Sequence, residues 1–222
     1  MSTRPDHNEV RTTYDTVASS YAESIPGLSA EAILDVAAID SFVERVLENG
    51  GGPVLDAGAG PGRITSYLVS RGVDASGVDL SPGMVEVARR SYPNLRFAVG
   101  SLGRLEFADA SLAGVVAWYS IIHTPPGELP GVFTDFHRVL RPGGVLLMGM
   151  HVGEGVLRVT RSYGHDVGID LQLFEPTEIA TALRERRFTI TAQVVREPQG
   201  RERRPQAFVL ATKAGGREPE LP

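Results

Sequence analysis

A turn rich in glycine constrains the fold of this chain more than any other stretch. The segment VLDAGAGPGR, residues 54–63, places Gly58, Gly60 and Gly62 within five residues, directly after a short apolar run. Glycine is costly in a folded chain unless the backbone needs an unusual φ angle or another group must approach closely. The segment therefore predicts a strand, a tight turn and a helix that starts near Arg63, with room for a ligand against the turn.

Strand and helix patterns alternate on both sides of this turn. Strands are predicted at 53–57, 73–79, 95–99, 112–119 and 145–150, and helices at 63–71, 82–92 (with Ser81 as N-cap) and 129–140. A helix at 177–186 and two strands, 189–196 and 206–212, follow and predict an antiparallel hairpin at one side of the sheet. Such alternation is typical of a mostly parallel sheet with helices on both faces, a three-layer α/β sandwich.

The first fifty residues precede this alternation and predict an N-terminal helical cap. Residues 8–21 have the pattern of one helix, and Ser29 is expected to cap a second helix that ends at the glycines of 50–52. Residues 215–222 are polar or rich in Pro and Gly, so we expect a flexible tail.

Composition limits the classes of protein to consider. The chain has 222 residues, a formal net charge of −5 and no cysteine, which excludes thiol nucleophiles and cysteine zinc sites, and we expect no metal. No apolar run approaches the roughly 18 residues of a membrane span, and the first ten residues lack a secretory signal, so we expect a cytoplasmic protein. An acidic balance argues against nucleic acid as a partner. The locally basic segment 196–204 is interpreted as a solvated loop.

The residues around the turn distinguish between two nucleoside cofactors. Asp79 ends the next predicted strand, 21 residues after Gly58, and an acidic residue at about that spacing binds ribose hydroxyls. A dinucleotide site has glycine at the sixth position of its pattern, where this chain has Arg63, and Pro61 removes one N–H from the turn. The carboxylate of Asp56 suits a cationic amino group. These residues together therefore favour S-adenosylmethionine (SAM) over NAD as the bound cofactor.

Five motifs together resemble those of class I SAM-dependent methyltransferases. They are VLDAGAGPGR (54–63), GVDLSPGM (77–84), LEF (105–107), VVAWYSIIH (115–123) and HRVLRPGG (137–144). The pattern Y-D-x-x-A-x-x-Y at 14–21 resembles the branch that acts on small molecules. The resemblance implies a seven-stranded, mostly parallel sheet with an antiparallel last strand, SAM as methyl donor and S-adenosylhomocysteine as product. It makes 1–50 a cap over the cofactor, 51–214 the methyltransferase domain and 151–175, which we expect to be loosely structured, an insertion that determines substrate specificity.

The resemblance also assigns cofactor contacts. They are Tyr14, Tyr21, Asp56, Gly58, Gly60, Arg63, Asp79, Leu80, Met84, Ser101, Leu102 and Ala117. Asp56 and the turn backbone would receive the methionine part, and Asp79 would accept both ribose hydroxyls. Arg63 would meet either the cofactor's carboxylate or a neighbouring acid. Leu80 and Met84 either wall the adenine or belong to the core.

Transfer of a methyl group to a protic acceptor requires alignment and the loss of a proton. Histidines beyond strand ends are the candidate bases: His123 after the fourth strand first, His151 after the fifth second, and His165 in the following segment third. Tyr14 and Tyr21 are seven residues apart on one face of the predicted helix. Their hydroxyls are expected to face the cofactor or the acceptor, which adds Tyr21 to the catalytic candidates.

The leading hypothesis is a methyltransferase acting on an O, N or C nucleophile of a small molecule, with secondary metabolism as a possible setting. A nucleic-acid methyltransferase is the first alternative, but residues 124–127 read TPPG and lack the aromatic residue that stacks a flipped base. A non-catalytic SAM-binding protein and an NAD-dependent reductase are further alternatives. A homodimer stays open, because the N-terminal helices and the hairpin edge could pair.

Overall fold

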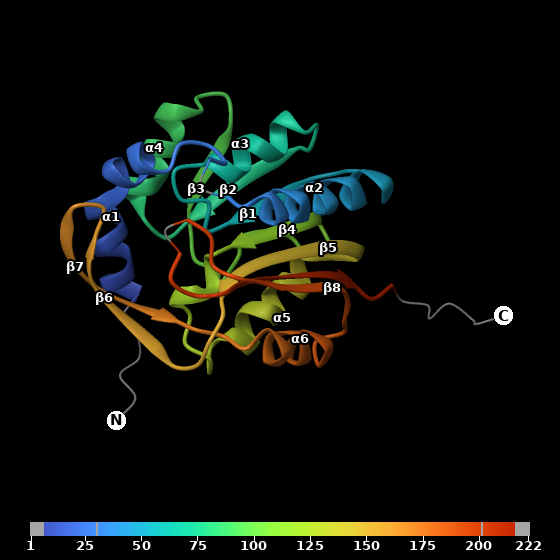
Figure 1. Ribbon diagram of the computed structural model, residues 1–222. Helices are drawn as coiled ribbons and strands as arrows, with labels where there is room; N and C mark the ends of the chain where they lie inside the picture. Colours follow the sequence, from blue (N-terminus) through green and yellow to red (C-terminus); the bar gives the residue numbers. More distant parts are fainter. Residues whose placement is uncertain (1–6, 30, 201, 216–222) are drawn as a thin grey trace.

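A seven-stranded sheet forms the middle layer of the computed structural model, which describes residues 7–29, 31–200 and 202–215 (Figure 1). Its strands are β1 (Val54–Ala57), β2 (Ala75–Asp79), β3 (Arg96–Val99), β4 (Leu112–Trp118), β5 (Leu140–His151), β8 (Phe188–Arg196) and β9 (Gln206–Lys213). They stand in the order β3-β2-β1-β4-β5-β9-β8. Strands β1 to β5 pair in parallel, whereas β9 is antiparallel to both β5 and β8. The predicted fold class is confirmed.

Helices cover both faces of this sheet. They are α1 (His7–Ser24), α2 (Ile33–Glu48), α3 (Arg63–Ser70), α4 (Pro82–Ser91), α5 (Leu129–Val139) and α6 (Pro176–Arg184), with a short 3-10 turn, η1, at Ile121–His123. Helices α2 and α3 lie on one face and α5 and α6 on the other (Figure 1). None of the described helices combines the length and the apolar character that crossing a membrane requires.

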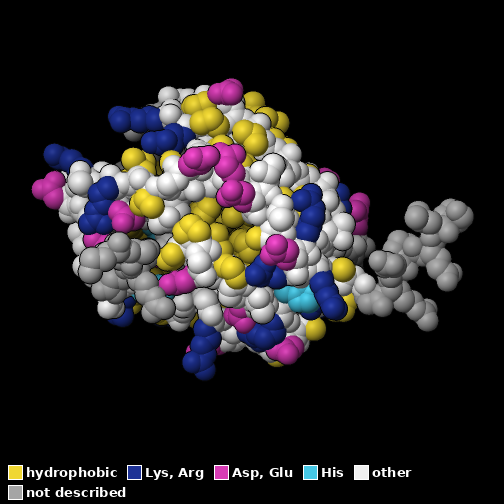
Figure 2. All heavy atoms as spheres, turned by 90° about the horizontal axis from the view of Figure 1, so that it is seen from below, with side chains coloured by type: hydrophobic (Ala, Val, Ile, Leu, Met, Phe, Trp, Pro, Cys, Tyr) yellow, Lys and Arg dark blue, Asp and Glu magenta, His cyan; other side chains and the backbone are white. Residues whose placement is uncertain are grey.

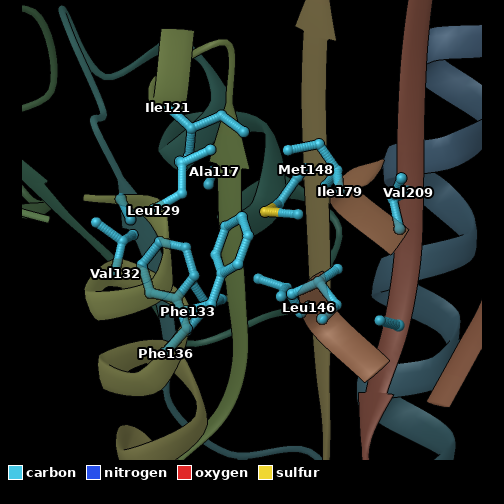
Figure 3. Packing of buried hydrophobic residues seen from close by; sticks show 14 of the residues in the cluster. Ala117, Ile121, Leu129, Val132, Phe133, Phe136, Leu146, Met148, Ile179 and Val209 are labelled. Atoms are coloured by element: carbon cyan, nitrogen blue, oxygen red, sulfur yellow. The ribbon is translucent and has the colours of Figure 1, made fainter. Parts of the chain in front are cut away.

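Each face of the sheet has its own hydrophobic cluster. On the α5 side, Phe133 and Phe136 are fully buried with Leu146 and Met148 of β5 (Figure 3). On the α2 side, Phe42 packs so close to β4 that a Cβ at Gly114 would lie 2.6 Å from its ring. Fully burying one such side chain stabilises the fold by about 1.5–3 kcal/mol. Helix α2 is therefore part of the sheet's own packing.

The predicted N-cap is confirmed for helix α4 but not for helix α2. Ser81 caps α4 as predicted, because its Oγ accepts a hydrogen bond from the Met84 N–H at 3.0 Å. The expectation that Ser29 caps the second helix is wrong. Helix α2 begins at Ile33, and the Asp35 carboxylate accepts a hydrogen bond from the Ala32 N–H at 3.2 Å, so an acid inside the first turn does the capping. The predicted tail lies, apart from Gly215, outside the described residues.

Residues 151–175 are more regular than the sequence suggested. They contain a two-stranded antiparallel sheet, β6 (Val156–Ser162) and β7 (His165–Gln172), so the expectation of a loose segment is wrong. The connecting residues Tyr163 and Gly164 have φ angles of 49° and 85°, as a tight two-residue hairpin turn requires. Figure 1 shows this hairpin beside α1. The insertion therefore forms an ordered wall next to the N-terminal helix.

The segment 196–204 begins with a buried ion cluster. The Arg196 guanidinium donates hydrogen bonds to Asp35 at 2.9 Å and to Glu202 at 2.6 and 2.7 Å. The side chains of Arg196 and Asp35 are almost fully buried. The prediction of a solvated loop is thus wrong for Arg196, which ties α2 to the β8–β9 connection.

Replacing Arg196 tests how much this ion cluster contributes to the stability of the fold. Arg196→Met leaves the buried Asp35 carboxylate without its counter-ion, so we expect a loss of about 3–5 kcal/mol in the free energy of unfolding. Urea denaturation measures this loss, with the exposed neighbour Arg203→Met as the matched control. A loss below about 1 kcal/mol for Arg196→Met would contradict this role.

Candidate active site

A cavity of about 450 Å³ opens where β1, β2 and β4 end. Ligands bind at this edge of open α/β sheets, at the point where the strand order reverses. Nine of the twelve predicted cofactor positions line it, namely Tyr14, Tyr21, Gly58, Gly60, Asp79, Leu80, Met84, Ser101 and Leu102. The structure thus brings most of the predicted positions together.

The glycine turn is shaped for close approach. Gly58 has a φ of 83°, and a Cβ built there would lie 2.2 Å from the Cβ of Ser120. Gly60 has a φ of 53°, and nothing described lies within 4 Å of where its Cβ would stand. Gly58 is therefore required by packing, whereas Gly60 leaves open space at the cavity wall.

The Asp79 carboxylate holds this turn. One oxygen accepts a hydrogen bond from the Gly60 N–H and the other from the Ser81 N–H, both at 2.8 Å. Burial raises the pKa of Asp79, and these backbone donors oppose that effect. Each carboxylate oxygen keeps a further lone pair. Asp79 can therefore still accept hydroxyl groups from a ligand in the cavity.

Asp56 and Ala117 do not reach the cavity lining that the structure describes. Asp56 is buried and accepts a hydrogen bond from the Thr65 hydroxyl at 2.7 Å, which ties β1 to α3 beneath the turn. Burial raises the pKa of Asp56 to about 6. Ala117 lies in the core cluster (Figure 3), while the next two residues, Trp118 and Tyr119, line the cavity.

Arg63 meets a neighbouring acid, the second of the two possibilities left open by the sequence. It forms an ion pair with Glu31 at 2.5 Å, and both side chains are largely buried. Glu31 also accepts a hydrogen bond from Trp118 Nε1 at 2.9 Å. No motif marks Glu31 in the sequence, so only the fold identifies it as the residue that positions Arg63.

The first candidate base, His123, is joined to Tyr14. The Tyr14 hydroxyl lies 2.7 Å from His123 Nε2, and Nδ1 of the same ring lies 3.1 Å from the Asp170 carbonyl oxygen. A carbonyl only accepts hydrogen bonds, so Nδ1 carries the proton and Nε2 accepts from Tyr14. Burial lowers the pKa of His123 to about 4 and raises that of Tyr14 well above its usual range. The pair is therefore neutral near pH 7.

The other two candidate histidines lie elsewhere. His151 lines a second chamber of about 290 Å³, which shares Tyr14, Tyr21 and Tyr119 with the main cavity. His165 begins β7 and lines neither space as the structure describes them. Among the residues that the structure describes, no group of three or more His, Asp or Glu side chains could hold a metal ion.

Ser120 supplies a test of whether the cavity fits a cofactor. Its hydroxyl is buried and has no hydrogen-bond partner among the described residues, although Ser120 lines the cavity beside Gly58. A buried polar atom of this kind calls for a bound group. An orphan hydroxyl, a glycine turn and the Asp79 carboxylate around one cavity fit a nucleoside with a polar amino-acid tail, as SAM has. Sequence reasoning missed Ser120.

Comparison with known proteins agrees with this geometry. Residues 54–144 match the family model described as a methyltransferase domain. The chain is 32% identical to demethylmenaquinone methyltransferase from Beutenbergia cavernae over 145 residues, which cover 64% of this chain and 58% of that protein. The chain spans 64%, 58% and 57% of the first three curated relatives it matches.

Solved structures share the fold. The structure of 1,6-didemethyltoxoflavin-N1-methyltransferase from Burkholderia thailandensis aligns with a TM-score of 0.65 at 22% identity. The alignment covers 96% of this chain and 92% of that protein's chain. A 4+2 cyclase, SpnF, has a TM-score of 0.73 at 19% identity, with 97% and 99% covered. Identities this low bear on the fold alone. The family model and the curated relatives support a class I SAM-dependent methyltransferase domain over residues 54–144, the part of the chain that the model matches.

The buried Asp56 carboxyl predicts a pH effect on stability. Its folded pKa, about 6, lies above its ordinary value of 3.8. The stability it contributes is therefore complete below the ordinary value and lost as pH rises through about 6. Relative to wild type, Asp56→Asn should gain about 2 kcal/mol of unfolding free energy between pH 4 and pH 8.

Urea denaturation at both pH values measures this gain, and Asp74→Asn, at an exposed carboxylate, is the matched control. An equal effect of the two substitutions at both pH values would contradict the raised pKa of Asp56.

Proposed function

We propose that the protein transfers a methyl group from SAM to a protic nucleophile of a small molecule. The observation that carries the proposal is one cavity with the Asp79 carboxylate and glycine turn in its wall together with the Tyr14–His123 pair. When bound, SAM would supply an electrophilic methyl group on its sulfonium. Asp79 would hold the ribose hydroxyls, and the turn backbone and Ser120 would receive the methionine part.

The Tyr14–His123 pair accounts for the acceptor's proton. Tyr14 lines both the main cavity and the second chamber. As the acceptor is methylated, its proton passes to the Tyr14 oxygen while the Tyr14 proton passes to His123 Nε2. Nδ1–H stays bonded to the Asp170 carbonyl, which keeps the ring aligned. Because burial disfavours the imidazolium, His123 then returns the proton to solvent. An O–H, N–H or acidic C–H acceptor suits this path.

The charge pattern argues against a nucleic-acid substrate. On the face in Figure 2, Lys and Arg side chains are dispersed among acidic ones, and hydrophobic side chains gather near the middle. Arg11, which lines the main cavity, pairs with Asp15 at 3.8 Å. A phosphate backbone would need a continuous basic surface. Cytoplasmic location, a homodimer and a setting in secondary metabolism remain further proposals from the sequence.

A transfer assay tests the proposed activity. The purified protein is incubated with SAM carrying a labelled methyl group and, separately, with tRNA, with duplex DNA and with a panel of neutral phenols and N–H heterocycles. We expect label in the small-molecule fraction alone. Label in tRNA or DNA would overturn the proposal, and so would SAM binding with no transfer to any member of the panel.

Asp79 should dominate cofactor affinity. Asp79→Ala removes two charge-assisted hydrogen bonds worth about 1.5–3 kcal/mol each, so we expect S-adenosylhomocysteine to bind at least 100-fold more weakly. Isothermal titration calorimetry measures the affinity, and circular dichroism checks folding. Asp74→Ala, at the other end of the β2 region, is the control and should bind normally. Unchanged affinity in Asp79→Ala would contradict the ribose assignment.

The tyrosine–histidine pair should act on turnover. With an acceptor from the panel, Tyr14→Phe and His123→Leu should each lower kcat by about 10²–10⁴-fold and leave S-adenosylhomocysteine affinity within about 3-fold. Because the two residues act as one unit, the double variant should be no slower than the slower single variant. Tyr67→Phe, which removes an outer hydroxyl bonded to Asp40, is the control. Normal kcat in Tyr14→Phe would contradict the proton path.

A further inference from the structure

The second chamber lies between α1, the β6–β7 hairpin and the end of β5, and its wall is aromatic. Tyr14, Tyr21, Tyr119 and Tyr163 all line it. The rings of Tyr21 and Tyr163 have centroids 4.7 Å apart, and those of Tyr119 and His151 lie 5.0 Å apart. Its volume, about 290 Å³, is at the lower end for ligand pockets. A compact planar ring system would find stacking partners here.

The ionic groups at the chamber wall are paired within the protein. Arg63 is held by Glu31 at 2.5 Å. Glu202 accepts hydrogen bonds from Arg196 at 2.6 and 2.7 Å. A charged ligand would lose its hydration without gaining a counter-ion, which is costly in a buried site. The chamber therefore selects an uncharged molecule.

His151 gives the chamber one directed polar group. The Gln206 Nε2 donates to the Arg204 carbonyl at 2.8 Å, so its Oε1 faces His151 and accepts a hydrogen bond from Nδ1 at 2.7 Å. Nδ1 thus carries the proton, and Nε2 is an acceptor without a hydrogen-bond partner among the residues described. Burial also lowers the pKa of His151, which keeps the ring neutral.

We propose that this chamber binds the methyl acceptor as an uncharged, planar aromatic compound, with a ring substituent other than the nucleophile donating a hydrogen bond to His151 Nε2. The role of this compound as methyl acceptor rests on the proposed function, whereas its chemical class is inferred from the chamber alone. The chamber and the main cavity share Tyr14, Tyr21 and Tyr119, so a compound held here faces the main cavity at Tyr14. The β6–β7 hairpin then determines specificity through the shape of this wall.

Three probes with one ring system test the proposed chemistry. Calorimetry at neutral pH, with and without S-adenosylhomocysteine, compares 2-naphthol, 2-methoxynaphthalene and 2-naphthoate. We expect 2-naphthol to bind best, 2-methoxynaphthalene about 3–10-fold more weakly because it cannot donate, and 2-naphthoate at least 10-fold more weakly. Equal or tighter binding of 2-naphthoate, or equal binding of the methoxy compound, would overturn the proposal.

Matched variants locate the probe. Val159 lines the chamber from β6, whereas Val156 on the same strand is exposed. Val159→Phe should weaken 2-naphthol binding at least 10-fold, and Val156→Phe should leave it unchanged. His151→Phe keeps a ring but removes the acceptor, so it should abolish the preference for 2-naphthol over the methoxy compound. Unchanged binding in Val159→Phe, or a preference that persists in His151→Phe, would contradict the site.

Thermal unfolding with S-adenosylhomocysteine distinguishes a failure of the chamber proposal from a failure of the proposed function. S-adenosylhomocysteine should raise the unfolding midpoint of wild type and of all three variants equally, which shows that each variant is folded and keeps the main cavity. Probe binding with no response to S-adenosylhomocysteine would overturn the proposed function but keep the chamber's ligand class. A normal response with no probe binding in wild type would overturn the chamber proposal alone.

Discussion

The Asp79 carboxylate is the contact on which the site depends. It accepts backbone hydrogen bonds from Gly60 in the glycine turn and from Ser81 at the start of α4. One half-buried acid thereby joins β1, β2 and α4 at the edge where the strand order reverses. Because these donors are backbone N–H groups, the turn conformation itself keeps Asp79 beside the cavity. The position of a ligand follows from this geometry.

Helix α1 covers the site because it is attached on two sides. Toward α4, Asp15 accepts hydrogen bonds from the Ser81 hydroxyl at 2.6 Å and the Gly83 N–H at 2.8 Å. Toward the hairpin, Glu9 accepts one from Arg158 at 2.6 Å. Tyr14 lies between these attachments, at the boundary of the two cavities. Proposed cofactor binding, proton transfer and acceptor choice thus all involve one helix.

Local rules predicted the parts of the fold that depend on neighbouring residues. The glycine turn, the Ser81 cap and the alternation of strands and helices could be identified from short windows. The β6–β7 hairpin also had a local signal, the alternation on both sides of Tyr163-Gly164, which the sequence interpretation missed. The expected cap at Ser29 failed because helix α2 begins four residues later, at Ile33, and the Ser29 hydroxyl donates its hydrogen bond to the Pro26 carbonyl instead.

Contacts between distant residues could not be predicted in this way. Tyr14 and His123 are 109 positions apart, and Asp35 and Arg196 are 161 apart. Neither pair forms a spaced motif, so their partnership depends on how α1 and α2 dock onto the sheet. The proton path and the buried ion cluster both belong to this class, whereas Asp79 could be identified because the turn and strand place it directly.

Thermal unfolding with S-adenosylhomocysteine, SAM and NAD, each in large excess, tests whether the cavity beside Asp79 binds SAM. A ligand at about 100 times its dissociation constant stabilises the folded state by about 2.7 kcal/mol, which corresponds to a rise of about 5–10 °C in the midpoint for a chain of this size. We expect this rise with S-adenosylhomocysteine and SAM and none with NAD. A rise with NAD alone, or no rise with any of the three, would contradict the assignment of the main cavity to SAM.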